Sequence, residues 1–395
     1  MATILPIPEQ DDRRDISTRP DLEDIPLARP RVADPHAVAE DVERILASGV
    51  LTNGPYVRQL EERAADYLHV RHCIAVASCT SGLMLLLRAA DLTGDVVTPS
   101  FTFAATAHAI AWNGLRPVFA DVEHSRLTLS PRSVRRMIGV RTSAILATHV
   151  FGAPCEVEEL EDLAAHNGIR LFFDAAHAFG SRRMEVPIGG FGHGEVFSLS
   201  PTKVLVAAEG GIIATNDDTM AERCRIGRDY GNPGDYDCRF IGLNARMSEV
   251  HAAIALNSLT DLEVRIERRN DLAAKYRESL SEVPGVSFLE PRKGDRSTYK
   301  DLTIRVESEE FGVDADELGQ ALDAVGIETR RYYSPPVHTM QAYRWLTGSN
   351  GRLPITEAAA QQTLTLPLWT DMTDEHVWRV ADAIYRVHRY QATRR

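Results

Sequence analysis

The sequence lacks the marks of several common protein classes. Its five cysteines are scattered over 395 residues without a CxxC pair, which excludes a disulfide framework and a cysteine-ligated zinc site. They are Cys73, Cys79, Cys155, Cys224 and Cys238. No apolar run approaches the ~20 residues of a membrane span, and MATILPIPEQDDRRD carries acidic residues where a signal peptide needs an apolar core. These absences predict a cytoplasmic protein with no membrane partner and no metal.

Positive charge is also in short supply. The formal net charge is −12, so the average surface repels nucleic acid and we expect no such partner. No GxGxxG follows the first predicted strand, which argues against a Rossmann-type NAD enzyme. Hydrophobic residues make up 44% and charged residues 25% of the chain, as in an ordinary globular enzyme. The local basic run RRYY (330–333) suits a small anionic ligand better than a polyanion.

The length predicts two unequal domains behind an N-terminal arm. Residues 1–33 are rich in Pro, Asp and Arg and are expected to be extended. Residues 34–260 alternate apolar strands such as SAILATHVFG and IRLFFDAAH with helical patterns, which predicts an α/β domain with a mostly parallel sheet covered on both faces. Residues 261–395 predict a smaller α+β domain with strands TYKDLTIRV and IETRRYY. A single long helix, from MSEVHAA to AKYRESL, is expected to join the two domains.

Polar residues follow several predicted strands, where ligands bind in open α/β sheets. Asp174 ends the apolar strand LFFD, and a carboxylate buried there needs a partner such as a protonated pyridine nitrogen. His177 lies close enough to hydrogen-bond a phenolic oxygen. The simpler interpretation is a helix N-cap Asp beside an incidental His, and the two interpretations are about evenly matched.

Two further strand ends carry candidates for a flat, phosphorylated ligand. Ser78, Thr80 and Ser81 in SCTSGL begin a helix, where free N–H groups and hydroxyls form a phosphate cup. Phe103 in TPSFTFAAT is able to stack on a ring. Taken alone, an ordinary N-cap and core packing explain these residues equally simply.

Lys203 lies in VFSLSPTKVLVAAEGGIIATND, between two predicted strands and after Ser198. Any single lysine is most simply a solvated surface charge. A lysine held in a turn near a carboxylate and a phosphate cup is instead suited to form an imine with a carbonyl cofactor.

An ordered series of motifs carries a resemblance to a known family. The motifs are NGPYVRQLEE, SCTSGL, TPSFTFAAT, DAAHAFG, FSLSPTKVLVAAEGG and IGLNARMSEVHAA. They resemble the DegT/StrS family of pyridoxal-phosphate-dependent sugar aminotransferases, from about residue 30 to the C-terminus. The resemblance implies the aspartate aminotransferase-like fold (fold type I), pyridoxal 5'-phosphate as cofactor, and a homodimer with a shared active site.

The resemblance also implies roles for individual residues. Lys203 matches the Schiff-base lysine and Asp174 the carboxylate on the pyridine nitrogen. The other implied cofactor contacts are His177 at the ring hydroxyl (often Gln in relatives), Phe103 on the ring, Thr80, Ser81 and Ser198 at the phosphate, and Asn244 reaching the phosphate from the partner subunit. His338, in PPVHTMQAYR, falls where relatives have a substrate-side His.

The substrates follow from the same resemblance. Some relatives replace the lysine with His and act as dehydratases, so Lys203 favours transamination, with L-glutamate as the usual donor. The motifs NGPYV, PSFTFAATAHA and EGG look closest to enzymes of amino-sugar biosynthesis that use a nucleotide-linked keto-deoxysugar of the dTDP-4-keto-6-deoxyglucose type. The segment SPTKVLVAAEGG departs from the commoner SFHATK form, which bears on substrate fit.

Three questions stay open at the level of sequence. Arg331 and Tyr333 are candidates for contact with a nucleotide diphosphate or base, and a solvated strand end is the alternative. A keto-cyclitol of the scyllo-inosose type, used in aminoglycoside biosynthesis, is the alternative acceptor. A non-catalytic regulator of the same fold is the third hypothesis, and it predicts loss of the lysine or the aspartate.

Overall fold

The computed structural model describes residues 23–346 and 352–393. The predicted arm therefore lies outside the described residues up to position 22. Its last part lies against the C-terminal region, where Ile25 is fully buried and forms a parallel bridge with Ile327. No helix within the described ranges is both long and apolar enough to cross a membrane.

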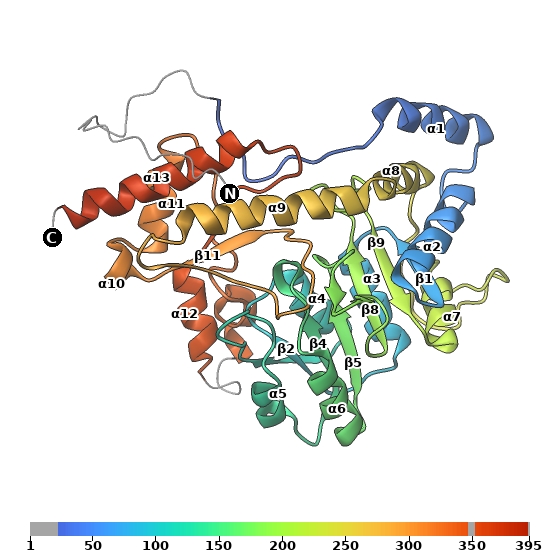
Figure 1. Ribbon diagram of the computed structural model, residues 1–395. Helices are drawn as coiled ribbons and strands as arrows, with labels where there is room; N and C mark the ends of the chain where they lie inside the picture. Colours follow the sequence, from blue (N-terminus) through green and yellow to red (C-terminus); the bar gives the residue numbers. More distant parts are fainter. Residues whose placement is uncertain (1–22, 347–351, 394–395) are drawn as a thin grey trace.

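A seven-stranded sheet forms the centre of the larger domain (Figure 1). Its strands are β1 (His72–Val76), β2 (Asp95–Pro99), β3 (Arg116–Ala120), β4 (Thr142–Thr148), β5 (Arg170–Asp174), β8 (Gly194–Ser198) and β9 (Gly211–Thr215). They lie in the order β1-β9-β8-β5-β4-β2-β3. Only β9 runs antiparallel to its neighbours, so the prediction of a mostly parallel sheet is confirmed.

Helices cover both faces of this sheet because its central strands are apolar on both sides. On β5, Phe172 packs in a cluster with Leu86 and Ile110, whereas Phe173 packs with Val157 and Leu160 on the opposite face. The helices of this domain are α1 (Pro35–Ser48), α2 (Pro55–Leu68), α3 (Cys79–Ala89), α4 (Ala104–Trp112), α5 (Pro131–Met137), α6 (Val157–Asn167), α7 (Asp218–Gly227) and α8 (Glu249–Leu259). A two-stranded ribbon, β6 (Arg182–Arg183) and β7 (Val186–Pro187), follows β5.

The smaller domain is an antiparallel three-stranded sheet covered by helices. Its strands are β10 (Val286–Phe288), β11 (Leu302–Val306) and β12 (Thr363–Leu366), and its helices are α9 (Leu262–Leu280), α10 (Ser308–Phe311), α11 (Ala315–Asp323) and α13 (Asp374–Ala392). Tyr276, Ile304 and Phe311 are among the buried residues of its core.

Two sequence predictions about this region are wrong. The expected single long helix is two helices, α8 and α9, separated at Thr260 and Asp261. At this break, the guanidinium of the buried Arg265 donates to the Ser258 carbonyl and pairs with Asp261. The segment IETRRYY is not a strand, since it forms only isolated bridges at Ile327 and Arg330.

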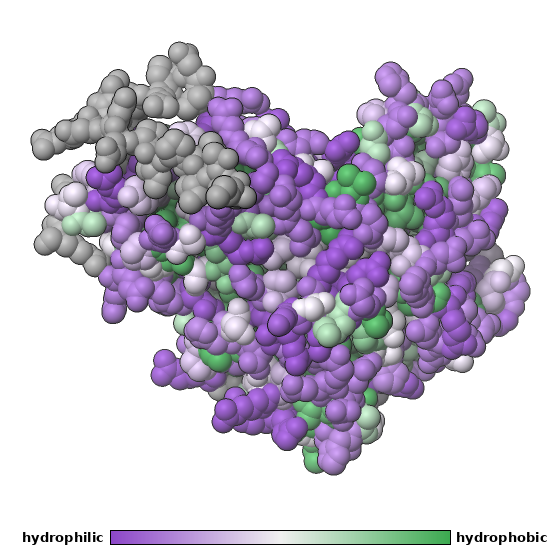
Figure 2. Space-filling model, in the orientation of Figure 1, coloured by the Kyte–Doolittle hydropathy of each residue, from purple (hydrophilic) through white to green (hydrophobic). Residues whose placement is uncertain are grey.

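The chain after this segment returns to the large domain. The short helices η2 (Val337–Thr339) and η3 (Gln341–Leu346) pack near β3 and α4, and α12 (Pro354–Gln362) follows them. Asp121, just after β3, accepts hydrogen bonds from the N–H groups of Ile355 and Thr356 at the start of α12. The two domains are therefore joined by a second connection besides α9. Figure 2 shows that the outer face seen there is mainly hydrophilic and is hollowed between α1 and α13.

Candidate active site

The carboxyl ends of the central strands meet at one edge of the sheet. Thr148 on β4 pairs with Asp174 on β5, which pairs with Val196 on β8. Because β9 is antiparallel to both β8 and β1, these two strands also end at this edge. The start of α3, the end of β8 and Asp174 are thus placed together by topology.

Asp174 is a buried carboxylate with two donors. Its Oδ2 accepts a 2.7 Å bond from the Thr106 hydroxyl on α4, and its Oδ1 accepts a 3.1 Å bond from the N–H of Ala176. Only 4% of the residue is exposed. Burial raises the pKa of Asp174, while these two bonds and the charge of Lys203 oppose the rise. Such a carboxylate favours a cationic partner at its open side.

Lys203 lies in the turn between β8 and β9. Its backbone N–H bonds to the Ser200 carbonyl at 3.0 Å, and Arg265 holds the next carbonyl, that of Val204, at 2.7 Å. Burial, together with the charge of the nearby Lys300 ammonium, lowers the pKa of Lys203 to about 8. A substantial fraction of the amine is therefore unprotonated slightly above neutral pH, as a nucleophile or proton acceptor requires, and this form predominates above a pH of about 8.

His177 is held as a neutral donor. The backbone N–H of Phe151 donates to His177 Nδ1 at 3.1 Å, so the ring proton resides on Nε2. Burial, with the charges of Lys203 and Lys300, sets the pKa of His177 well below its usual value. The Thr298 hydroxyl fixes the His177 carbonyl at 2.6 Å. The free Nε2–H suits a phenolate oxygen, as predicted from its position after Asp174.

The start of α3 combines a cap with free donors. Ser78 is the N-cap and accepts the N–H of Ser81 at 3.1 Å, and the Ser81 hydroxyl bonds back to the Ser78 carbonyl at 2.8 Å. The N-cap interpretation of this motif is confirmed for Ser78 and Ser81, whereas the phosphate cup stays a prediction. The Thr80 hydroxyl makes no hydrogen bond to any residue the structure describes. Ser198 ends β8 at the same edge, where its hydroxyl lies 3.4 Å from that of Ser200.

The two aromatic residues after β2 differ in role. Phe101 is fully buried and packs edge-on against Phe151 and Tyr333. Phe103, at the N-cap of α4, is 64% exposed and remains available to stack on a ligand ring. Asn244 is also exposed, and its backbone forms a bridge with Asp229.

The structure assigns Arg331 a task other than the predicted substrate contact. Its guanidinium donates to the carbonyls of Ala360, Gln361 and Thr363 and pairs with Asp316. These groups lie at the end of α12, where unpaired carbonyls attract a cation. The substrate prediction for Arg331 is therefore wrong, because its donors are used within the fold.

The other two substrate candidates are both buried. His338 receives the Ser100 hydroxyl at Nδ1 (2.6 Å), and its Nε2 lies 3.7 Å from Glu357, so it anchors η2 to the end of β2. Tyr333 stacks on Phe151 at 5.9 Å. Its pKa is raised well above the usual value by burial and by the carboxylates of Asp301 and Asp174.

Sequence reasoning missed three residues beside this site. Thr106 orients Asp174, and Lys300 and Asp301 form a buried ion pair at 2.6 Å. A Lys-Asp pair directly before an apolar strand is an unusual place for two charges, and this was the available signal. Thr106 gave no signal, because a threonine within a helix start is ordinary.

These groups fit pyridoxal phosphate. The buried carboxylate suits its pyridine nitrogen, and the amine with a lowered pKa suits its aldehyde. The neutral imidazole donor suits its hydroxyl, and the exposed phenyl ring suits its ring face. The helix start with free N–H groups suits its phosphate. When bound, this cofactor withdraws electrons from the carbon that carries the amino group. With the cofactor bound, Lys203 would supply the amine that takes and returns a proton there, and Asp174 would keep the pyridine nitrogen protonated.

Comparison with known proteins agrees with this site. Residues 34–385 match the model of the DegT/DnrJ/EryC1/StrS aminotransferase family. A dTDP-4-amino-4,6-dideoxy-D-glucose transaminase of Escherichia coli is 32% identical, with 90% of this chain and 96% of that protein covered. A pleiotropic regulatory protein of Geobacillus stearothermophilus is 32% identical over 89% of this chain and 94% of its own length.

Solved structures of sugar aminotransferases are also similar to this chain. The structure of DesI in the presence of its TDP-sugar product is 37% identical, with a TM-score of 0.89 over 94% of this chain and 95% of that one. S. venezuelae DesV, in complex with a ketimine intermediate, is 31% identical, with a TM-score of 0.84 over 91% and 99% of the two chains. The fold and site therefore define a pyridoxal-phosphate-dependent transaminase of fold type I. The chain belongs to the DegT/DnrJ/EryC1/StrS aminotransferase family.

Proposed function

We propose that this transaminase moves the amino group of L-glutamate to a nucleotide-linked keto-deoxysugar of the dTDP-4-keto-6-deoxyglucose type. The observation that carries the proposal is Lys203, a half-buried residue with a lowered amine pKa near Asp174, in a chain that covers almost the whole length of DesI. The E. coli relative is named for a dTDP-4-amino-sugar, which is the aminated form of such a keto-sugar.

Each residue of the site has a defined task in this reaction. Asp174 binds the protonated pyridine nitrogen, His177 donates Nε2–H to the ring oxygen, and Phe103 stacks on the ring. Thr80, Ser81 and Ser198 receive the phosphate. Lys203 removes the proton from the donor's α-carbon and returns it on the cofactor side, then works in the opposite direction with the acceptor, giving ping-pong kinetics.

We further propose a homodimer in which Asn244 completes the phosphate site of the partner. Its exposed side chain and the exposed tyrosines of the same loop, Tyr230 and Tyr236, support this arrangement. Exposed aromatic residues of this kind are enriched in protein interfaces.

Product analysis tests the acceptor. Purified enzyme loaded with pyridoxal phosphate is given L-glutamate with a panel of dTDP- and UDP-linked 3-keto- and 4-keto-6-deoxysugars and with scyllo-inosose. We expect the wild type to form a 4-amino-sugar nucleotide and the Lys203→Ala variant to form none.

Other outcomes would overturn the proposal. Amination of scyllo-inosose alone assigns the cyclitol. No product and no visible absorbance after loading assigns a regulatory role, the function in the name of the Geobacillus relative. Retention of both Lys203 and Asp174 favours catalysis.

A further inference from the structure

Lys300 is a buried cation that the reaction described above leaves unassigned. It lies in the segment before β11 and is 6% exposed, and its neighbour Asp301 is 5% exposed. Its Nζ donates to Asp301 Oδ1 at 2.6 Å and lies 5.9 Å from the centre of the Tyr332 ring. An ammonium has three donors, and in the part of the chain that the structure describes only this one hydrogen bond uses them.

The segment that carries Lys300 is fixed against the active site. Thr298 bonds to the carbonyl of His177, and the fully buried Arg269 donates to the carbonyls of Thr298, Tyr299 and Lys300. The charge of Lys300 is felt by both Lys203 and His177, since it lowers the pKa of each. Lys300 thus lies in a segment that is fixed to His177 and is close enough to Lys203 for its charge to affect that amine.

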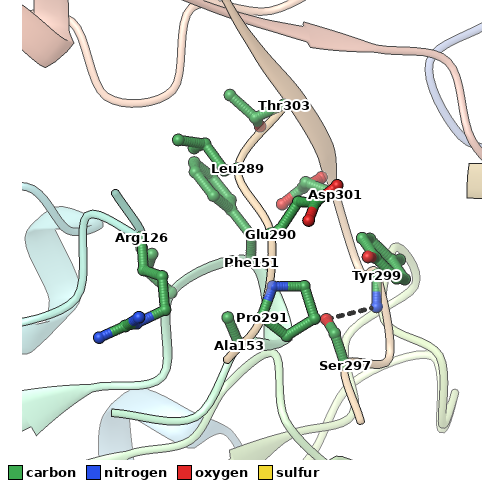
Figure 3. A pocket seen from close by; sticks show the side chains of 11 residues that line it. Arg126, Phe151, Ala153, Leu289, Glu290, Pro291, Ser297, Tyr299, Asp301 and Thr303 are labelled. Carbon is green, nitrogen blue, oxygen red and sulfur yellow. Dashed lines mark hydrogen bonds between the residues drawn. The ribbon is translucent and has the colours of Figure 1, made fainter. Parts of the chain in front are cut away.

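Lys300 and Asp301 each keep polar atoms without a hydrogen-bond partner among the described residues. Asp301 Oδ2 is buried without a hydrogen-bond partner among the described residues. It borders a small pocket between Phe151 and Tyr299, of about 10 Å³, which holds roughly one water molecule and no substrate (Figure 3). Buried ammonium donors without partners are costly, so an anion on the active-site side of Lys300 would stabilise it.

The chemistry of transamination says which anion belongs there. In an amino-acid donor, the carbon whose proton Lys203 removes also carries the α-carboxylate. The cation that recognises this carboxylate must therefore lie close to Lys203. A sugar diphosphate is separated from the keto carbon by the width of the sugar ring, and the cofactor phosphate is expected at the start of α3. The nearby Arg269 and Arg331 are not free for this task, because their donors are used on backbone carbonyls.

We propose that Lys300 binds the α-carboxylate of the amino-acid donor and so determines donor specificity. The inference rests on the proposed function only in taking L-glutamate as the donor. Lys300 turns one of its unpaired N–H groups to the carboxylate, while another donates to Oδ1 of Asp301.

The test compares L-glutamate with L-isoglutamine, in which a neutral amide replaces the α-carboxylate. The half-reaction is followed by loss of cofactor absorbance, and the dissociation constant of 2-oxoglutarate is measured by calorimetry. The wild type should prefer L-glutamate. In Lys300→Met, both this preference and the affinity for 2-oxoglutarate should fall by at least roughly tenfold. The exposed Lys293→Met, in the same connecting segment, is the matched control and should change neither.

Two further variants separate this role from a structural one. Lys300→Met with Asp301→Asn removes both charges, which avoids a lone buried carboxylate, and should show the same loss of preference. Asp301→Asn alone should keep the preference. Unchanged discrimination in the folded double variant, or a raised KM for the nucleotide sugar alone, would overturn the proposal.

The half-reaction with L-glutamate needs no sugar, so its result is independent of the acceptor. A wild type that aminates no keto-sugar refutes the proposed acceptor and leaves the role of Lys300 standing if the preference falls in Lys300→Met. A wild type that releases no 2-oxoglutarate from L-glutamate refutes both.

Discussion

Thr106 on α4 donates its hydroxyl hydrogen to Oδ2 of Asp174 on β5 at 2.7 Å, and this bond fixes a buried carboxylate from the neighbouring helix. We expect Thr106→Val to destabilise the cofactor-free protein at pH 7.5 by about 1–3 kcal/mol, since a buried charged acceptor loses a donor. Thr106→Ser should restore most of this. Urea unfolding measures both, and equal stability of the valine and serine variants would contradict the assignment.

We expect that replacing Asp174 raises the stability of the cofactor-free protein and abolishes its activity. Its folded pKa is raised, so the folded state binds more protons than the unfolded state between pH 3.8 and that raised value, and stability falls as pH rises through this window. Above the window the cost is constant. Cofactor-free Asp174→Asn should therefore be more stable than the wild type at pH 7.5 by roughly 1 kcal/mol or more, and less so near pH 4.

Urea unfolding at the two pH values checks this expectation. The same variant should retain pyridoxal phosphate poorly and show no turnover. A variant that is less stable at pH 7.5 would mean that Asp174 is not an unpaired charge in the cofactor-free fold.

How far the sequence predicts this molecule depends on the range of the interactions. The mostly parallel sheet, the enzyme class and the cofactor were predictable, because strand periodicity and the motifs around Asp174 and Lys203 are local signals. These predictions are confirmed by the fold and the family match. The roles of Phe103, Ser198 and Asn244 stay predictions, since they depend on the ligand or on a second subunit.

Long-range contacts explain what the sequence did not reveal. Arg331 resembled a ligand residue within RRYY, but its partners are carbonyls near the end of α12, about thirty positions away. Lys300 and Asp301 gave only the signal of two charges before an apolar strand, and their burial depends on packing of their segment against Arg269 and His177. The break between α8 and α9 is an exception, because the contacts of Arg265 with Ser258 and Asp261 are local and the apolar periodicity did not reveal them.

The reactivity of Lys203 gives a pH profile. Its pKa of about 8 means that the unprotonated fraction rises through that pH. Below it, the rate at which cofactor-free enzyme attaches pyridoxal phosphate should increase about tenfold per pH unit, and above it the rate should level off. Borohydride trapping and mass spectrometry locate the label. Lys275, whose pKa is raised by Asp374 and Asp271, should stay unlabelled near pH 8.

Asn244 provides a test of the shared active site. Lys203→Ala and Asn244→Ala homodimers should each be inactive or strongly impaired. If each site combines Lys203 of one subunit with Asn244 of the other, a one-to-one mixture after subunit exchange has one intact site per hybrid dimer, or about a quarter of wild-type activity. Activity that stays at the sum of the two parents would show that Asn244 acts within its own subunit.

Arg331 should affect stability and not substrate binding. Arg331→Met leaves the last carbonyls of α12 without their donors, so we expect a loss of about 1–3 kcal/mol in unfolding free energy. KM values for L-glutamate and the keto-sugar should remain within about twofold, because the guanidinium donates to backbone carbonyls and pairs with Asp316. A large rise in KM for the nucleotide sugar with unchanged stability would reinstate the substrate role.

Arg269 gives the small domain a mechanical part in the reaction. One guanidinium on α9 holds three successive carbonyls of the segment that carries Thr298 and Lys300. The same segment bonds to the His177 carbonyl through Thr298, so a displacement of α9 should be transmitted to His177 and Lys300 together. Substitutions far along the helix should therefore be able to change turnover without altering any residue that meets a substrate.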